Sequence, residues 1–473
     1  MPPEIDLFAS PRGSVTAPAG CGKTQLITDT LCLHQGPKPI LILTHTNAGV
    51  SALRARLQRS RVPNTAYRLS TIDGFAIRLV TKFPQRSGCA PRHLELDNAR
   101  EDYPAIRNSA GLLLQAGHVN EVLQATYSRL LVDEYQDCGI GQHVIVTWLA
   151  TVIPTCVLGD PMQAIFGFRG NQLVNWQTDL EAFFPPIGQL ATPWRWRGAG
   201  AEALGNWLLA ARAQLQAGRP VDLRGAPPEV QWIPLTANAV EERRSAAQTT
   251  APNRQGSVLI IGDARNSSSR YLVASQTPGA MAVEPADLTD LIHFCRQFDV
   301  TAPTALEGLV NFSAGLMTGV GAADLLKRVP IIRNGRNRTP PTPAEDAAVS
   351  FANAPSLPTA MALLNRFMDQ PGTRVFRPDV LYGCLSALQN AAGGTCTLPM
   401  AATQIRERNR HVGRPLSKRA VGSTLLLKGL EADVAVILHP EQMTAANLYV
   451  ALTRGAQRVV ICSATPLLTP VAG

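Results

Sequence analysis

The residues that most clearly indicate chemistry lie near the start of the chain. The region contains the run Ala17–Thr24, A-P-A-G-C-G-K-T, between a β-prone segment and a helix-compatible one. A strand, a glycine-rich loop and a helix in this order form a phosphate-binding loop, because the loop N–H groups and the positive helix end face the same anion. The run therefore predicts binding of a nucleoside triphosphate. A glycine-rich turn without a ligand is the alternative.

Side chains of this loop have separate predicted roles. Gly20 and Gly22 would let the backbone curl around the phosphates. Lys23 would reach the β- and γ-phosphates, and the Thr24 hydroxyl would coordinate Mg²⁺. The predicted cofactors are therefore ATP and Mg²⁺. The predicted nucleotide-binding residues of this region are Ala17, Gly20, Cys21, Gly22, Lys23, Thr24 and Gln25.

A second group of reactive side chains follows an apolar run. Leu131-Val132 leads directly into the paired carboxylates Asp133 and Glu134. At the end of a strand beside a phosphate loop, Asp133 could hold Mg²⁺ through its water shell, and Glu134 could polarise the attacking water. A surface acidic cluster is the alternative, which the placement after a strand makes a minor one.

The elements that must position these groups alternate strands with helices. Apolar runs ending in polar residues predict strands of a sheet buried on both faces. Ligands of such sheets bind outside the carboxyl ends of the strands, so the pattern predicts a doubly wound α/β core and a second one after it. The predicted strands are 13–16, 39–44, 129–132, 155–158, 257–261, 434–438 and 458–462, and the region 275–417 is predicted to be mostly helical.

Composition sets wider limits on the protein. Its 473 residues predict two to four domains, and the net charge of +9 fits either a polyanionic partner or a bias toward Arg. Nine cysteines without a C-x-x-C pair predict neither a zinc site nor a disulfide framework. Neither a secretory signal nor an apolar stretch long enough to cross a bilayer is evident. We therefore expect a soluble, cytoplasmic protein without a membrane partner.

Two segments together resemble a known family. Leu131–Asp137 (L-V-D-E-Y-Q-D) and Gly159–Gly170 (G-D-P-M-Q-A-I-F-G-F-R-G) are similar to the DE-[FY]-QD and GD-x-x-Q-[SA]-I-[YF]-x-[WF]-RG motifs of superfamily 1 helicases of the UvrD/Rep/PcrA group. The resemblance implies that Gln163 couples the γ-phosphate to the grip on DNA. It also implies that Phe166 and Phe168 stack on bases, with core packing as their alternative.

Further segments match this family in the same order along the chain. Thr44–Ala48 and Ser70–Phe75 resemble its T-x-T-N-x-A and T-x-H-x-F segments, with Asp73 where His is usual. The resemblance implies contacts with single-stranded DNA or DNA ends. The implied DNA-binding residues are Thr46, Asn47, Phe75, Phe166, Phe168 and Arg169.

Three later segments complete the implied nucleotide site. Trp194-Arg195, Lys428–Glu431 and Tyr449–Arg454 resemble the aromatic-Arg pair, K-G-L-E and Y-V-A-x-T-R of the family. The resemblance implies that Trp194 stacks on adenine, that Glu431 contacts the ribose, and that two arginines neutralise the transferring phosphoryl group. The implied catalytic residues are Glu134, Gln163, Arg195 and Arg454, and the implied metal-binding residues are Thr24 and Asp133.

The resemblance also implies an architecture. We expect an α/β protein with two RecA-like P-loop NTPase domains, whose parallel sheets are flanked by helices and each interrupted by a mainly helical insertion. The predicted bounds are 1–78 and 118–190 for domain 1A, 79–117 for insertion 1B, 191–274 and 418–473 for domain 2A, and 275–417 for insertion 2B. Closure of the two domains around ATP would move single-stranded DNA, in the 3′-to-5′ direction typical of the family.

The chain departs from the family pattern in ways that leave the function open. Residues 1–13 contain no Gln that could read adenine, Leu425–Leu427 replace the usual His before Lys428, and both insertions are short. The missing Gln predicts relaxed nucleotide selectivity, and the missing His weakens the implied DNA contact near Lys428. The short insertions favour translocation over processive unwinding. We weigh a free-standing helicase or translocase, an ATPase subunit that regulates a partner OLD-family nuclease as in Gabija-type anti-phage systems, and a nucleotide-binding switch. The complete hydrolytic set argues against the switch.

Overall fold

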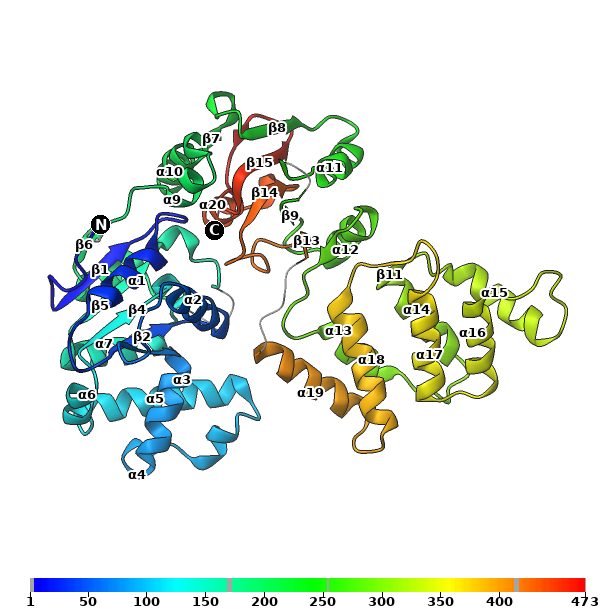
Figure 1. Cartoon of the computed structure of the whole chain (residues 1–473), viewed down its shortest axis with the longest axis horizontal. Helices are drawn as coiled ribbons and strands as arrows, with labels where there is room; N and C mark the ends of the chain where they lie inside the picture. Colours follow the sequence, from blue (N-terminus) through cyan, green and yellow to red (C-terminus); the bar gives the residue numbers. More distant parts are fainter. Residues whose placement is uncertain (1–3, 168–171, 253–254, 412–416, 473) are drawn as a thin grey trace. The chain divides into compact units, whose positions relative to one another are not determined.

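Two six-stranded parallel sheets flanked by helices organise the protein and confirm the predicted α/β class with two RecA-like domains. The computed structural model, drawn in Figure 1, describes residues 4–167, 172–252, 255–411 and 417–472. The chain divides into two compact units. Unit 1 contains residues 1–229, 443–457 and 467–473, and unit 2 contains residues 230–442 and 458–466.

The sheet of unit 1 has the strand order β3-β2-β4-β5-β1-β6, and its paired strands are parallel. Its strands are β1 (Arg12–Thr16), β2 (Ile40–Thr44), β3 (Tyr67–Thr71), β4 (Arg129–Val132), β5 (Thr155–Gly159) and β6 (Pro186–Gln189). The four strands predicted from apolar runs are confirmed. The carboxyl ends of β1, β2, β4 and β5 meet at one edge of the sheet, where the predicted reactive residues lie.

Both faces of this sheet are buried by helices. Along β2, Ile40 and Ile42 pack in one core and Leu41 and Leu43 in the other, because successive side chains of a strand point to opposite faces. Helices α1 (Lys23–Leu33) and α2 (Asn47–Arg59) cover the first face, whereas α3 (Ile72–Lys82), α5 (Ala99–Gln115) and α7 (Ile140–Val152) cover the second.

Further elements complete unit 1. They are α4 (Pro84–Ser87), α6 (Asn120–Thr126), α8 (Glu181–Phe183), α9 (Trp194–Gly198), α10 (Glu202–Gln216), α20 (Ala445–Leu452), β7 (Val221–Asp222) and β16 (Leu467–Leu468), with the 3₁₀ turns η2 (Tyr135–Asp137) and η3 (Pro161–Gln163). Helix α20 comes from the late part of the sequence and packs on α10 and η3. Unit 1 therefore includes a helix that is distant in the sequence from the strands of its sheet.

The sheet of unit 2 has the strand order β10-β13-β9-β14-β15-β8. Its strands are β8 (Val230–Pro234), β9 (Val258–Ile261), β10 (Met281–Ala282), β13 (Arg419–Gly422), β14 (Ala432–Ile437) and β15 (Gly455–Ser463), accompanied by α11 (Ala239–Ala247) and α12 (Ser267–Gln276). The predicted strands at 257–261, 434–438 and 458–462 are confirmed as β9, β14 and β15. Strands β8, β10 and β13 were not predicted, because β8 is partly exposed, β10 has two residues, and β13 (R-A-V-G) has only two apolar residues between Arg and Gly.

The predicted helical region of unit 2 is confirmed as a bundle with its own apolar core. Its elements are α13 (Thr289–Gln297), α14 (Ala305–Ala314), α15 (Ala322–Arg333), α16 (Pro343–Asn353), α17 (Leu357–Met368), α18 (Pro378–Ala392) and α19 (Leu398–His411), with the antiparallel pair β11 (Met317–Thr318) and β12 (Arg374–Val375). In Figure 1 these helices run from green through yellow to orange. The predicted limits of the domains and insertions remain predictions.

An ionic cluster around the buried Arg377 joins this bundle to the sheet of unit 2. The Arg377 guanidinium donates to Glu284 at 2.7 and 3.0 Å and to Asp290 at 2.6 Å. It also lies 3.6 Å from the centre of the Tyr271 ring. Because Arg377 precedes α18 and Asp290 begins α13, one guanidinium ties the start of both helices to the end of β10. In the described part of the chain, no helix is long and apolar enough to cross a membrane.

Candidate nucleotide-binding site

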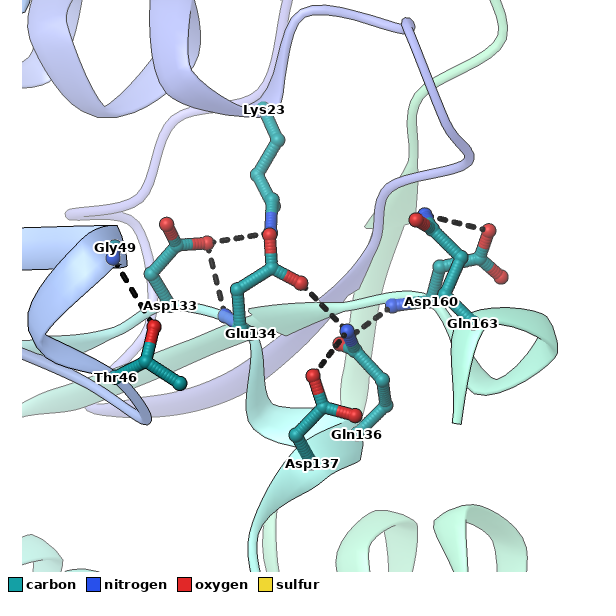
Figure 2. Close-up of polar contacts among 9 residues, drawn as sticks. All are labelled: Lys23, Thr46, Gly49, Asp133, Glu134, Gln136, Asp137, Asp160 and Gln163. Carbon is teal, nitrogen blue, oxygen red and sulfur yellow. Dashed lines mark hydrogen bonds and ion pairs between the residues drawn. The ribbon is translucent and has the colours of Figure 1, made fainter. Parts of the chain in front are cut away.

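The centre of the candidate site is Lys23 of the glycine-rich loop. Its ammonium lies 2.6 Å from Asp133 Oδ1 and also pairs with Glu134 Oε1, as Figure 2 shows. Lys23 starts α1 after β1, and the two carboxylates follow β4. The parallel sheet therefore brings the three predicted charges together at its carboxyl edge.

Burial and charge act against each other on this cluster. Burial alone would lower the pKa of Lys23, but Asp133 and Glu134 raise it above its ordinary value. Burial raises the pKa of Asp133, and the positive charge of Lys23 counteracts that rise. The ammonium is therefore fully charged and acts as the counter-ion of two carboxylates.

Glu134 has a backbone conformation that few residues other than glycine adopt. Its φ of 56° and ψ of 41° lie in the left-handed region. Such a conformation costs about 1–3 kcal/mol and persists where the surroundings enforce it, often at functional sites. Here the sharp turn after β4 lets consecutive residues, Asp133 and Glu134, both reach Lys23.

The glycine-rich loop is tightly enclosed by two tryptophans. Gly20 and Gly22 have φ values of 68° and 89°, which favour glycine. A Cβ on Gly20 would lie 2.6 Å from Cζ3 of Trp196, and one on Gly22 would lie 2.9 Å from Cδ1 of Trp194. Trp194 is 44% exposed beside Gly22. A flat aromatic face is thus available next to the loop, where a nucleotide base could stack.

A chain of amide and carboxylate contacts links the ends of β4 and β5. The Gln136 amide donates to Glu134 Oε2 at 2.5 Å and accepts from the N–H of Asp160 at 3.1 Å. Gln163 in turn donates to Asp160 Oδ2 at 3.3 Å, as seen in Figure 2. A change at Glu134 can therefore reach Gln163 through two side chains.

A buried ion pair fixes this chain to a neighbouring helix. Arg212 of α10 donates to Asp160 Oδ1 through Nε at 3.1 Å and through a terminal nitrogen at 2.7 Å. Its other terminal nitrogen donates to Gln216 at 3.1 Å. Both partners of the ion pair are buried. Asp160 is therefore held by Arg212 on one side and by Gln136 and Gln163 on the other.

Helix α20 and the turn after it contact the loop and α9. The Ala19 N–H donates to the Tyr449 hydroxyl at 3.0 Å, and the Arg195 guanidinium donates to the Thr453 carbonyl at 2.7 Å. Arg454 is buried, and its Nε donates to the Val450 carbonyl at 2.8 Å. The predicted residues Arg195 and Arg454 therefore lie in unit 1 together with the phosphate loop.

The remaining predicted nucleotide residues of the loop lie around Lys23. Ala17 and Cys21 are buried, and burial raises the pKa of the Cys21 thiol to about 12. Thr24 is half-buried in the first turn of α1. Gln25 is exposed, and its amide contacts Asp29 at 2.6 Å and Arg56 at 2.9 Å. Glu431 is exposed before β14 in unit 2, so its place at the site remains a prediction.

The residues fit a magnesium nucleotide in their chemistry. The N–H groups of a loop with two left-handed glycines suit phosphate oxygens. The Thr24 hydroxyl and Asp133 carboxylate are hard oxygen ligands of the kind that Mg²⁺ takes in small number beside waters and phosphates.

The predicted DNA-binding residues have different surroundings. Thr46 is exposed and caps α2 by accepting from the Gly49 N–H at 3.0 Å, as Figure 2 shows. Asn47 is exposed in the first turn. Phe166 is half-buried, with its ring centre 5.9 Å from that of His45. Phe75 is 5% exposed and packs in the sheet core, so its environment is that of a core residue and not of a DNA-contacting one. Phe168 and Arg169 lie outside the described residues.

Asp73, which stands where the family has His, has its own partners. The Arg107 guanidinium of α5 donates to its two carboxylate oxygens at 2.6 and 2.7 Å. The Gln142 amide of α7 donates to it at 3.1 Å. Asp73 thus ties α3 to α5 and α7, a role that no local sequence signal indicates.

Three contributors to the site were not assigned a role from the sequence. Asp160 and Gln136 lie within the quoted motifs, but only the structure reveals that they connect Glu134 to Gln163. Arg212 lies in no motif, and a buried Arg opposite a strand-end Asp is recognisable only in three dimensions.

Fold and site together have the features of a P-loop nucleotide-binding protein. Consistently, residues 9–110 and 97–183 match the family model of the UvrD/REP helicase N-terminal domain. The chain is 33% identical over 85 residues to the ATP-dependent DNA helicase PcrA of Staphylococcus aureus, covering 18% of this chain and 12% of PcrA. It is 32% identical over 105 residues to the ATP-dependent DNA helicase UvrD1 of Mycobacterium leprae, covering 20% of this chain and 13% of UvrD1.

The family model matches the N-terminal part of the chain. The matched segments span about an eighth of the length of the curated relatives. They support a UvrD-like helicase relationship for the domain that carries the phosphate loop and the paired carboxylates.

Proposed function

We propose that the protein is a UvrD-like ATP hydrolase that uses Mg-ATP to move along single-stranded DNA. The observation that carries this proposal is Lys23, placed between Asp133 and Glu134 at the end of a glycine-rich loop. Lysine and paired carboxylates at the carboxyl edge of a parallel sheet are the groups that phosphoryl transfer to water requires.

Each side chain has a role in this proposal. Lys23 neutralises the β- and γ-phosphate oxygens, and Thr24 and Asp133 hold the metal. Glu134 accepts the proton of the water whose oxygen attacks the γ-phosphorus, while the bond to the bridging oxygen of ADP breaks. Arg195 and Arg454 offset the charge that develops on the phosphoryl group. Trp194 stacks on the base, and Glu431 contacts the ribose. Mg-ATP, when bound, supplies the phosphoanhydride bond.

The change from bound ATP to bound ADP reaches the proposed DNA-binding residues through contacts within unit 1. Gln136 joins Glu134 to Asp160, and Asp160 joins Gln163. Because Gln163 ends η3 just before Phe166, a shift of the Glu134 carboxylate reaches an aromatic side chain that we propose to contact bases. Thr46 and Asn47, exposed at the start of α2, would hold the phosphates of the strand.

Steady-state ATP hydrolysis with and without single-stranded DNA tests the proposal. We expect strong stimulation by DNA, none of it remaining in Lys23→Ala. Glu134→Gln should bind ATP but turn it over about 10²- to 10⁴-fold more slowly, since it loses only the proton acceptor. A switch protein would instead show equal, slow hydrolysis in Glu134→Gln and in the wild type.

The result also separates a free-standing motor from a subunit of a larger assembly. Hydrolysis that is indifferent to DNA would contradict the free-standing motor. In that case a search for a neighbouring nuclease gene, co-expression with its product and a repeat of the assay on any complex would test the nuclease-regulating subunit.

A further inference from the structure

One stretch of unit 1 carries only positive charge. Between Asp29 and Asp73 the sequence contains no acidic residue. The basic residues of this stretch are Lys38, Arg54, Arg56, Arg59, Arg61 and Arg68. Three of the arginines lie on α2 and Arg61 follows directly after it. A net charge of +9 for the whole chain is thus concentrated in part on one helix and the turn after it.

The exposed side of α2 is made of small, cationic and uncharged amide residues. Val50, Leu53 and Leu57 face the core, and the exposed positions are Asn47, Ala48, Ser51, Ala52, Arg54, Ala55, Gln58 and Arg59. With about 100° per residue, Arg54 and Arg59 stand about 140° apart, on either side of the small residues. Large apolar side chains are missing from these positions. The shape lets a polymer backbone approach closely between two guanidinium groups.

These arginines differ from other exposed arginines of the chain in their partners. Arg197, Arg224 and Arg244 pair with Glu202, Asp222 and Glu241 at 2.6, 2.6 and 3.0 Å. Within the described residues, Arg54, Arg59 and Arg61 form no ion pair with an acidic residue. Their charge is therefore available to an external anion.

This surface continues from the predicted DNA site. Thr46 caps α2 at the carboxyl edge of β2, and the helix runs from there for 13 residues, or about 20 Å. Arg54 lies in the middle of α2, Arg59 at its end and Arg61 just beyond it. A strand held by the start of α2 would meet these arginines in turn as it leaves the carboxyl edge.

We propose that the α2 basic face, defined as Arg54, Arg59 and Arg61, binds the phosphate backbone of single-stranded DNA. The inference rests on the proposed function and extends it, because it adds a second segment of the track that leads away from the nucleotide edge. Charge complementarity, close approach over small residues and the lack of internal partners all favour a polyanionic strand.

Binding of oligothymidine at several salt concentrations tests the α2 basic face. We expect Arg54→Gln/Arg59→Gln to lower the magnitude of the slope of log K against log[salt] by about 1.4, since each lost single-strand contact contributes about 0.7. This decrease in slope should appear with an oligonucleotide of about 16 nucleotides and be absent with one of about 4. ATP hydrolysis without DNA should not change, because these side chains lie outside the nucleotide site.

Arg224→Gln/Arg244→Gln is the matched control, because it removes the same charge from exposed positions elsewhere. Equal slopes in the wild type and the α2 variant, with DNA-stimulated hydrolysis intact, would overturn the inference and leave the proposed function standing. If the slope falls equally in the α2 variant and in the control, the change is an effect of net charge, and the inference is overturned. If the slope falls only when blunt duplex DNA is the ligand, the partner of the α2 basic face is duplex DNA and not a single strand, which overturns the inference. A wild type that neither binds nor responds to DNA would overturn both proposals.

Discussion

Lys23 has two tasks that must be separated in any experiment. It is the proposed phosphate ligand, and it is also the counter-charge of two neighbouring carboxylates, one of them buried. Removing it leaves Asp133 and Glu134 facing each other without compensation. A loss of ATP hydrolysis in Lys23→Ala therefore has to be read together with the stability of the variant.

We predict that Lys23→Ala lowers the free energy of unfolding by about 3–5 kcal/mol at neutral pH, the range for breaking a buried ion pair from one side. Burial raises the pKa of Asp133, and Lys23 is the main charge that opposes the rise. Without Lys23 the native carboxyl binds its proton more tightly than the unfolded chain does. The deficit should therefore shrink as the pH falls through the range between the unfolded and the raised native pKa.

Urea denaturation of both proteins at pH 5 and pH 8 measures this dependence, since denaturation midpoints report the difference in stability. Lys23→Ala/Asp133→Asn is the control, because it removes one of the uncompensated carboxylates and should recover part of the loss at pH 8. A deficit that is equal at both pH values would show that Lys23 does not stabilise ionised carboxylates.

At the scale of elements, apolar runs predict the buried strands of the sheets well and the strands at the sheet edges poorly. All five residues of β2 are buried, so the run 39–44 predicted it well. Strand β8 is half-exposed and β10 has two residues, so neither has a distinctive pattern. The charges at strand ends could be predicted from motifs. Arg212 could not, because its partner Asp160 lies 52 positions away and only packing of α10 brings them together.

We predict that Arg212→Met lowers the free energy of unfolding by about 3–5 kcal/mol, since it leaves the fully buried Asp160 carboxylate without its cation. The same change should raise the ATP concentration needed for half-maximal hydrolysis, because Asp160 positions Gln163. Thermal unfolding and steady-state kinetics on one preparation measure the two effects.

Two controls define the role of the Arg212–Asp160 pair. Arg224→Met removes an exposed cation that pairs with Asp222, and it should change neither stability nor kinetics appreciably. Arg212→Gln/Asp160→Asn removes both charges and keeps hydrogen-bonding groups, so it should be more stable than Arg212→Met. If the single and the double variant are equally unstable, uncompensated charge is not the cause.

At the scale of the whole molecule, unit 1 is assembled from three separate stretches of chain. Helix α20 is the part that returns to the nucleotide loop, where Tyr449 accepts the N–H of Ala19. Trp196 on the other side of the loop donates to Gly455 at 2.9 Å. The loop is therefore supported by residues that precede and follow the whole of the helical bundle in the sequence.

We predict that Tyr449→Phe destabilises the protein by about 1–3 kcal/mol, because the buried N–H of Ala19 loses its acceptor. The affinity for ATP should fall as well, because Ala19 belongs to the phosphate loop. Titration with a fluorescent ATP analogue and thermal unfolding test the two effects. Tyr382→Phe, at an exposed position of α18, is the control. Unchanged ATP affinity in Tyr449→Phe would mean that α20 does not organise the loop.

The contact between Ala19 and Tyr449 also has a consequence for the order of synthesis. The two residues are 430 positions apart. At roughly 5–20 residues per second, a ribosome needs about 20–90 s to travel from one to the other. Throughout that interval the nascent chain already carries the loop but lacks the helix that supports it. The proposed nucleotide turnover would therefore require that translation has passed α20.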